Sequence, residues 1–165
     1  MLAAGKLSVE NGAHIVTQQF LDSFLILSGS GITFGLVIAM LFAAKSKQYK
    51  ALGKVAAFPA IFNVNEPVVF GFPIVMNPVM FLPFIIVPIL AAIIVYTSIA
   101  IGFMHPFSGV TLPWSTPAII SGFMVGGWQG AFVQVLVLAT STVVYFPFFK
   151  FQDNLAYNNE LQAEK

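Results

Sequence analysis

The sequence predicts an all-α integral membrane protein, and its composition, charge distribution and long apolar runs support this fold class. Of its 165 residues, 58% are hydrophobic and 8% are charged, whereas soluble domains carry about a quarter charged residues. The chain holds 7 basic and 6 acidic side chains, and between Val55 and Phe149 the only formal charge is Glu66. A surface so poor in charge cannot face water, so we expect residues 55–149 to lie mainly in the membrane.

The composition and the net charge also disfavour several classes of function. The chain has no cysteine, which excludes disulfides, zinc–thiolate sites and a thiol nucleophile within it. Its net charge is +1, and its one basic cluster, residues 45–54, is too small to predict a nucleic-acid partner. No metal or cofactor is expected.

Three apolar segments are long enough to cross a bilayer, which takes about 20 apolar residues in a helix. They are Ser23–Ala44, Val79–Met104 and Gly127–Phe149. Proline interrupts helices because it lacks an amide donor, so we expect the second segment to be broken early by Pro83 and Pro88. About three transmembrane helices are therefore predicted.

The charges flanking these segments predict an orientation and a division of the chain. Lysines 45, 47, 50 and 54 follow the first segment, and Lys150 follows the third. Cytoplasmic loops are enriched in basic residues, so both places are expected to face the cytoplasm and the turn near His105 the outside. We predict a polar N-terminal segment (1–16), a membrane domain (17–149) and a cytoplasmic tail (150–165).

Two further segments, near 57–78 and 105–126, are apolar but unsuited to ordinary helices. They hold seven of the chain's ten prolines, at positions 59, 67, 73, 78, 106, 113 and 117. Interrupted backbone at membrane depth is tolerated only where it is buried in protein or lines a cavity. We therefore predict two re-entrant helical hairpins that meet around a site, as in secondary transporters. The alternative is a pair of connecting loops.

The first of these segments carries the most reactive group, in the run Asn63-Val64-Asn65-Glu66-Pro67. A carboxylate at membrane depth costs several kcal/mol unless it is solvated or paired, and no lysine or arginine lies near Glu66 in the sequence. Asn63, Asn65 and Glu66 together offer the donors and acceptors that a polyhydroxylated ligand needs. The alternative is a protonated Glu66 that stabilises the hairpin turn.

Two motifs resemble a known family. Residues 58–78 read F-P-x-I-F-N-x-N-E-P-V-V-F-G-F-P-I-V-x-N-P, and residues 112–117 read L-P-W-S-T-P, followed by I-I-S-G-F at 119–123. Both are similar to segments of the membrane IIC component of phosphotransferase-system permeases in the lactose, cellobiose and diacetylchitobiose family. The resemblance runs from about Gln18 to the C-terminal tail.

The resemblance implies a function and its partners. It implies the substrate-binding half of a permease that carries a β-linked disaccharide, such as cellobiose, lactose or chitobiose, across the bacterial cytoplasmic membrane. A phosphorylated IIB protein would transfer its phosphoryl group to the sugar's hydroxyl on carbon 6, as part of the phosphoenolpyruvate-dependent system. Family members are more than twice as long and homodimeric, so we expect this chain to be a fragment that requires a missing N-terminal IIC half.

The resemblance also suggests roles for individual residues. Glu66 would hydrogen-bond the non-reducing sugar and act as the general base, and Asn65 would orient the same sugar. Trp114 is a candidate for stacking on the sugar ring or, alternatively, an interfacial anchor. Ser115 and Thr116 would contribute hydroxyl groups, or cap the helix expected to start near Pro117.

Two other functions remain open from the residues alone. Glu66 would be the coupling site of an ion or proton carrier, although one acid without a second acid or a histidine nearby makes a poor relay. A purely structural subunit would leave Glu66 unexplained. His105 is expected at the membrane interface, and the glycine pairs Gly31/Gly35 and Gly126/Gly130 are expected to allow close helix approach.

Overall fold

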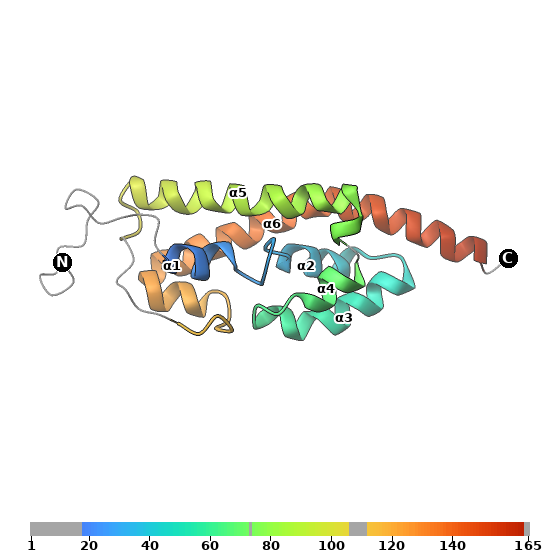
Figure 1. The fold of residues 1–165 in the computed structure, drawn as a ribbon, viewed down its shortest axis with the longest axis horizontal. Helices are drawn as coiled ribbons and strands as arrows, with labels where there is room; N and C mark the ends of the chain where they lie inside the picture. Colours follow the sequence, from blue (N-terminus) through green and yellow to red (C-terminus); the bar gives the residue numbers. More distant parts are fainter. Residues whose placement is uncertain (1–17, 73, 106–111, 164–165) are drawn as a thin grey trace, which may run out of the picture.

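The computed structural model describes residues 18–72, 74–105 and 112–163, and every regular element in these ranges is helical (Figure 1). The predicted N-terminal segment, residues 1–16, lies outside the described residues. In chain order the elements are α1 (Gln18–Phe20), the π-helical turn η3 (Leu21–Leu25), α2 (Phe34–Ala43), α3 (Lys47–Ile61), α4 (Glu66–Gly71), the 3-10 turn η4 (Ile74–Met76), α5 (Pro78–Ala100) and α6 (Ile120–Ala163).

Two helices of the described chain, α5 and α6, are long and apolar enough to cross a membrane. They lie side by side and run in opposite directions along the long axis of the molecule (Figure 1). The predicted second span is confirmed as α5, but this helix is not broken at Pro83 or Pro88. Each proline removes a single amide donor, a loss that a packed helix tolerates at membrane depth.

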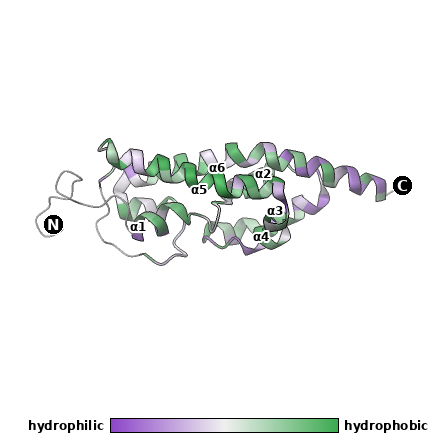
Figure 2. Cartoon of the chain, turned by 45° about the horizontal axis from the view of Figure 1, so that its top comes forward, coloured by the Kyte–Doolittle hydropathy of each residue, from purple (hydrophilic) through white to green (hydrophobic). Residues whose placement is uncertain are grey.

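The third predicted span lies within α6, which continues without interruption past residue 150 to Ala163. Figure 2 shows apolar colour along α5 and the first part of α6, and polar colour toward the C-terminal end of α6 and the start of α3. Most of the charged residues that the structure describes therefore gather at one end of the molecule, with Asp22 and Glu66 as exceptions.

The prediction of one helix over Ser23–Ala44 is wrong. The chain turns between η3 and α2, and Ser28, Gly29, Gly31 and Ile32 all have positive φ. This region of φ is disfavoured for residues with a side chain, so surrounding contacts must hold the turn in place. We call residues 26–33 the break.

The first predicted hairpin is present and begins earlier than predicted, at Lys47. Helix α3 leads to a turn at residues 62–65, and α4 returns from it. Both ends of the hairpin contact the C-terminal part of α6: the amides of Lys47 and Gln48 donate to Glu160, and Gln152 donates to Asn77 at 3.1 Å. The hairpin therefore enters and leaves at the same end of the molecule.

The structure describes only part of the second predicted hairpin, because residues 106–111 lie outside the described residues. Its returning arm is the first part of α6, which reverses direction at Gly126 and Gly127, so that Gly122 lies against Gly130. A Cβ atom on Gly126 would lie 3.0 Å from the sulfur of Met104, just beyond α5. In Figure 1 the loop before this arm reaches the middle of the molecule, where it faces the turn between α3 and α4.

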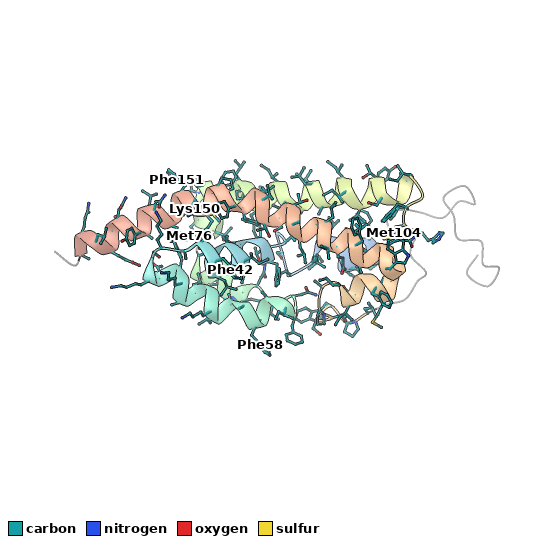
Figure 3. All side chains as sticks on the ribbon, turned by 180° about the vertical axis from the view of Figure 1, so that it is seen from behind. Phe42, Phe58, Met76, Met104, Lys150 and Phe151 are labelled. Carbon is teal, nitrogen blue, oxygen red and sulfur yellow. The ribbon has the colours of Figure 1, made fainter. Side chains whose placement is uncertain are left out.

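Aromatic packing anchors the first hairpin to α6. Tyr49 of α3 stacks on Phe72, which follows α4, with ring centroids 4.4 Å apart, and both rings contact Phe149 of α6. All three side chains are buried. Other apolar side chains face outward, among them Phe58, which projects from α3 (Figure 3). Such a surface suits lipid or further protein rather than water.

Candidate functional site

The two hairpin tips and the break meet at the side chain of Asn63. The Asn63 Nδ2 group donates hydrogen bonds to the carbonyl oxygens of Trp114, at 2.7 Å, and Thr116, at 2.9 Å. Its Oδ1 atom accepts a hydrogen bond of 2.7 Å from the backbone amide of Ser28. One amide side chain thus joins three interrupted segments that are distant in sequence, and we call this place the junction.

Local backbone geometry explains why asparagine occupies this position. Asn63 has a φ of 63°, and asparagine tolerates the left-handed region better than most residues. Its side chain is 8% exposed, so its polar groups need partners within the protein. The three hydrogen bonds meet that need.

Asn65 makes a second link between the first hairpin and the break. Its Nδ2 group donates to the carbonyl oxygen of Ser30 at 2.7 Å. A Cβ atom on Gly29 would collide with the Asn65 amide, and Gly29 has a φ of 80°. Only glycine therefore permits this approach of the break to Asn65 without strain.

Helix α6 supports the break from its other side. Ser141 Oγ donates to the carbonyl oxygen of Ile32 at 2.6 Å, and Tyr145 Oη donates to that of Gly31 at 2.8 Å. Both side chains are fully buried. They satisfy carbonyl groups that the interruption of the helix leaves without helical partners.

Glu66 is the first residue of α4 and lies directly after the turn at the junction. Its side chain is exposed, and no hydrogen bond or ion pair joins its carboxylate to another described residue. A carboxylate at a helix N-terminus is stabilised by the helix dipole. Glu66 therefore presents free acceptor oxygens to a ligand.

The second hairpin contributes Trp114, Ser115 and Thr116 to the junction. The Trp114 ring is 65% exposed although its backbone carbonyl is bonded to Asn63. Thr116 Oγ1 donates to the carbonyl oxygen of Pro113 at 2.7 Å within the turn, and Ser115 is half-buried. The structure thus brings the predicted residues into one region, with Glu66 and Trp114 presenting free side chains and the Asn63 amide fully occupied.

Gln134 is a junction residue that the sequence analysis missed. It is fully buried in α6 after the kink and makes four hydrogen bonds, three with residues before the kink and one with Ser23 of η3. The sequence does show an uncharged amide within an apolar run at this position, but hydropathy averaged over the run hides it. His105, in contrast, is exposed beyond the C-terminal end of α5, and that end of α5 lies away from the turn between α3 and α4 (Figure 1).

The charged end of the molecule carries a separate arrangement. Asp153 is fully buried and accepts hydrogen bonds from the amides of Lys45, at 2.8 Å, and Ser46, at 3.0 Å. Glu160 accepts from the amides of Lys47 and Gln48, and these bonds lower its pKa below the ordinary value. We call Asp153 and Glu160 the clamp, because together they hold the start of α3.

No group of three or more histidine, aspartate or glutamate side chains lies together in the described ranges. The chemistry that the junction offers is therefore hydrogen bonding and proton acceptance by a carboxylate, beside an aromatic face.

Comparisons with known proteins identify a family. The family model "Phosphotransferase system, EIIC" matches residues 1–88. The lichenan permease IIC component of Bacillus subtilis (strain 168) is 45% identical over 152 residues, which cover 91% of this chain and 34% of that protein. The cellobiose-specific EIIC component of Geobacillus stearothermophilus is 42% identical over 142 residues, covering 85% of this chain and 32% of that protein.

A solved structure shares the fold. The crystal structure of ChbC, the IIC component of the N,N'-diacetylchitobiose-specific phosphotransferase system, matches with a TM-score of 0.86 and 40% sequence identity. The match covers 88% of this chain and 34% of ChbC. The chain thus spans about a third of the length of the relatives it matches.

Proposed function

The chain belongs to the phosphotransferase-system EIIC family, in its lactose, cellobiose and chitobiose branch, and on this premise we propose that it is the sugar-binding part of a β-disaccharide permease. The observation that carries the proposal is the junction, where two hairpin tips and a broken helix meet around Asn63. A free carboxylate and an exposed indole ring from opposite hairpins lie in this region.

Glu66 binds the sugar and takes up a proton in this proposal. Its carboxylate accepts hydrogen bonds from the hydroxyl groups of the non-reducing sugar. As the hydroxyl oxygen on carbon 6 attacks the phosphoryl group carried by the IIB cysteine, Glu66 accepts the hydroxyl proton as general base. The cysteine of IIB leaves as a thiolate, which agrees with a membrane component that contains no cysteine.

The other junction residues hold the sugar and shape the site. The exposed face of Trp114 stacks on the apolar face of the ring, with Ser115 and Thr116 contributing hydroxyl groups to the same wall. Asn65 orients the sugar through its Oδ1 atom, while its Nδ2 group stays on Ser30. Asn63 acts from behind this surface, because its bonds to Ser28, Trp114 and Thr116 use its amide.

In the bacterial cytoplasmic membrane, α5 and α6 form two spans, and α1, η3, the break and α2 together form a third, interrupted span. The hairpins at α3–α4 and around residues 112–126 are re-entrant and point toward each other. The lysine-rich end that includes the clamp faces the cytoplasm, where phosphorylated IIB approaches. The N-terminal half found in relatives would supply the remaining scaffold and the homodimer contact.

The alternative function is an ion carrier that uses Glu66. The hydrogen bonding of the carbonyl groups in the break gives it less support. Unwound segments bind cations through free carbonyl groups, but here the carbonyls of Ser28, Ser30, Gly31 and Ile32 each accept a hydrogen bond from a side chain of the protein. The break is thus stabilised by protein donors.

Tryptophan fluorescence tests the sugar site with a control supplied by the chain. Trp114 and Trp128 are its only tryptophans, and they are 65% and 64% exposed. Only Trp114 lies at the junction, since Trp128 packs edge-on to Phe103 at 5.8 Å. In a membrane-embedded permease with any tryptophans outside this chain replaced by phenylalanine, cellobiose should change the fluorescence of the Trp128→Phe variant. The same change in Trp114→Phe, with none in Trp128→Phe, would place the sugar elsewhere.

A further inference from the structure

We infer that Gln134 is a positioning residue that sets the place of the Trp114–Thr116 tip relative to the broken helix. This inference rests on the proposed sugar site, and it adds a residue that neither the motifs nor the charge pattern single out. Gln134 does not touch the sugar; it acts through the backbone that carries the tip.

The four hydrogen bonds of Gln134 connect three parts of the structure. Its Oε1 atom accepts from the amides of Ile119, at 2.5 Å, and Gly122, at 3.0 Å. Its Nε2 group donates to the carbonyl oxygen of Ser23, at 2.7 Å, and to Ser121 Oγ, at 2.9 Å. The long arm of α6, the returning arm of the second hairpin and η3 are thus joined by one side chain.

The position of these bonds gives Gln134 control over the tip. The amides of Ile119 and Gly122 belong to the first turn after the Trp114–Thr116 loop, where a helix has no backbone partners for its amides. A Cβ atom on Gly122 would lie 2.5 Å from Gln134 Oε1, so glycine is required at 122 for the contact. Ile119 has a φ of 72°, a strained conformation for a β-branched residue that surrounding bonds must hold.

Two side-chain amides therefore hold the second hairpin at two different places. Asn63 holds the carbonyl groups of the tip from the first hairpin, and Gln134 holds the amides behind the tip from α6. Because Gln134 also bonds Ser23, the tip is tied to η3, the turn that leads into the break. Loss of Gln134 should displace Trp114 from Glu66 and weaken sugar binding.

Three variants of the full membrane-embedded permease test this. Gln134→Met keeps the approximate shape and removes all four bonds. Gln134→Glu keeps the acceptor, and only its protonated form donates to Ser23. Gln129→Met is the matched control, because Gln129 lies on the same helix and its side chain makes no hydrogen bond with the described residues.

Two readouts separate positioning from sugar binding itself. The first is equilibrium cellobiose affinity. The second needs no sugar: spin labels on Phe58→Cys and Ile120→Cys, both at exposed positions of this cysteine-free chain, report the distance between the two hairpins once any cysteines in the rest of the permease are replaced.

We expect Gln134→Met to lower cellobiose affinity about tenfold, because the tip that carries Trp114 is no longer held in place, and to broaden the label distance distribution. Gln129→Met should change neither. The cellobiose affinity of Gln134→Glu, relative to wild type, should rise as the pH falls from about 8 to about 5. Burial favours the protonated acid, and only the protonated acid can donate to Ser23.

Wild-type affinity and an unchanged distance distribution in Gln134→Met would overturn the inference. If Gln134→Met does not fold, a Gln134→Glu affinity equal to wild type at every pH overturns it instead. If wild type binds no cellobiose, the proposed function fails, and the distance distributions alone decide the role of Gln134.

Discussion

Single side-chain amides organise this site. Asn63, Asn65 and Gln134 are uncharged, yet each links segments far apart in sequence through buried or partly buried hydrogen bonds. Amides suit this task because they carry both donors and acceptors and need no counter-ion in an apolar surrounding. The charged Glu66 is left free for the ligand.

Asn63→Ala should destabilise the protein by about 1 to 3 kcal/mol, because it leaves the buried amide of Ser28 and the carbonyl groups of Trp114 and Thr116 without their partner. Thermal unfolding in detergent, followed for the whole permease, measures this. Ser115→Ala is the control, since its hydroxyl makes no hydrogen bond with the described residues. Equal melting temperatures for the two variants would show that Asn63 is not a structural link.

The residues of the site divide into those that sequence can identify and those it cannot. Glu66 stands out because it is the one charge in an apolar stretch, and Asn63, Asn65 and Trp114 lie in recognisable motifs. Gln134 escapes notice because its partner Ser23 lies 111 residues away. No local pattern encodes a contact at that separation.

At the scale of elements, a continuous helix supplies hydrogen-bond partners for the backbone groups that an interrupted helix leaves unpaired. The clustered prolines mark segments where helical bonding fails, and the structure shows a helix–turn–helix at α3 and α4; that both segments are re-entrant hairpins stays a prediction. The break was missed, since hydropathy averages over Ser28-Gly29-Ser30-Gly31 and reports one apolar span. The donors that stabilise this break, Ser141 and Tyr145, come from α6. No local sequence pattern at the break identifies them.

The clamp makes stability depend on pH. Hydrogen bonds from the amides of Lys47 and Gln48 lower the pKa of Glu160 below its ordinary value. A group whose pKa is lowered on folding stabilises the protein above its unfolded pKa, and this contribution is lost as the pH falls through the folded pKa. Wild type should therefore lose thermal stability below about pH 4.5.

Glu160→Gln tests the clamp. An amide cannot titrate, so the variant should be less stable than wild type near neutral pH and should show a shallower loss in acid. Melting temperatures across this range, measured on both proteins in the same detergent, give the comparison. Parallel curves would assign the acid sensitivity to another carboxyl group.

At the scale of the whole molecule, polarity separates the two ends. Lysines 45 to 54, the clamp and the polar part of α6 lie at one end, and the C-terminal end of α5 lies at the other (Figures 1 and 2). The first hairpin starts from the polar end, the returning arm of the second leads to the kink at the other end, and Asn63 joins their tips. This arrangement places the site midway along the long helices, the depth at which transporters commonly bind their substrates.

Cysteine labelling tests the orientation. The chain has no native cysteine, and the exposed positions Lys50, His105 and Asn158 suit single substitutions, whereas Ser46 is buried. In intact cells, an impermeant thiol reagent should label His105→Cys, and it should reach Lys50→Cys and Asn158→Cys only after the membrane is opened. Labelling of Lys50→Cys from outside would reverse the orientation.

The central claim is that Glu66 both binds the sugar and accepts its proton. Glu66→Gln keeps the shape and one acceptor oxygen but removes the base. Losing a hydrogen bond to a charged group costs about 1.5 to 3 kcal/mol of binding, whereas losing a general base lowers the rate about 100-fold to 10,000-fold. Asn65→Ala is the matched control, since it should weaken binding with a smaller effect on the chemical step.

The most direct measurement compares equilibrium cellobiose binding with phosphoryl transfer from phosphorylated IIB, in the full-length permease, for wild type, Glu66→Gln and Asn65→Ala. The account predicts that Glu66→Gln loses far more transfer rate at saturating sugar than it loses affinity. Binding and phosphoryl transfer at wild-type levels in Glu66→Gln would contradict it and leave the carboxylate with a structural role.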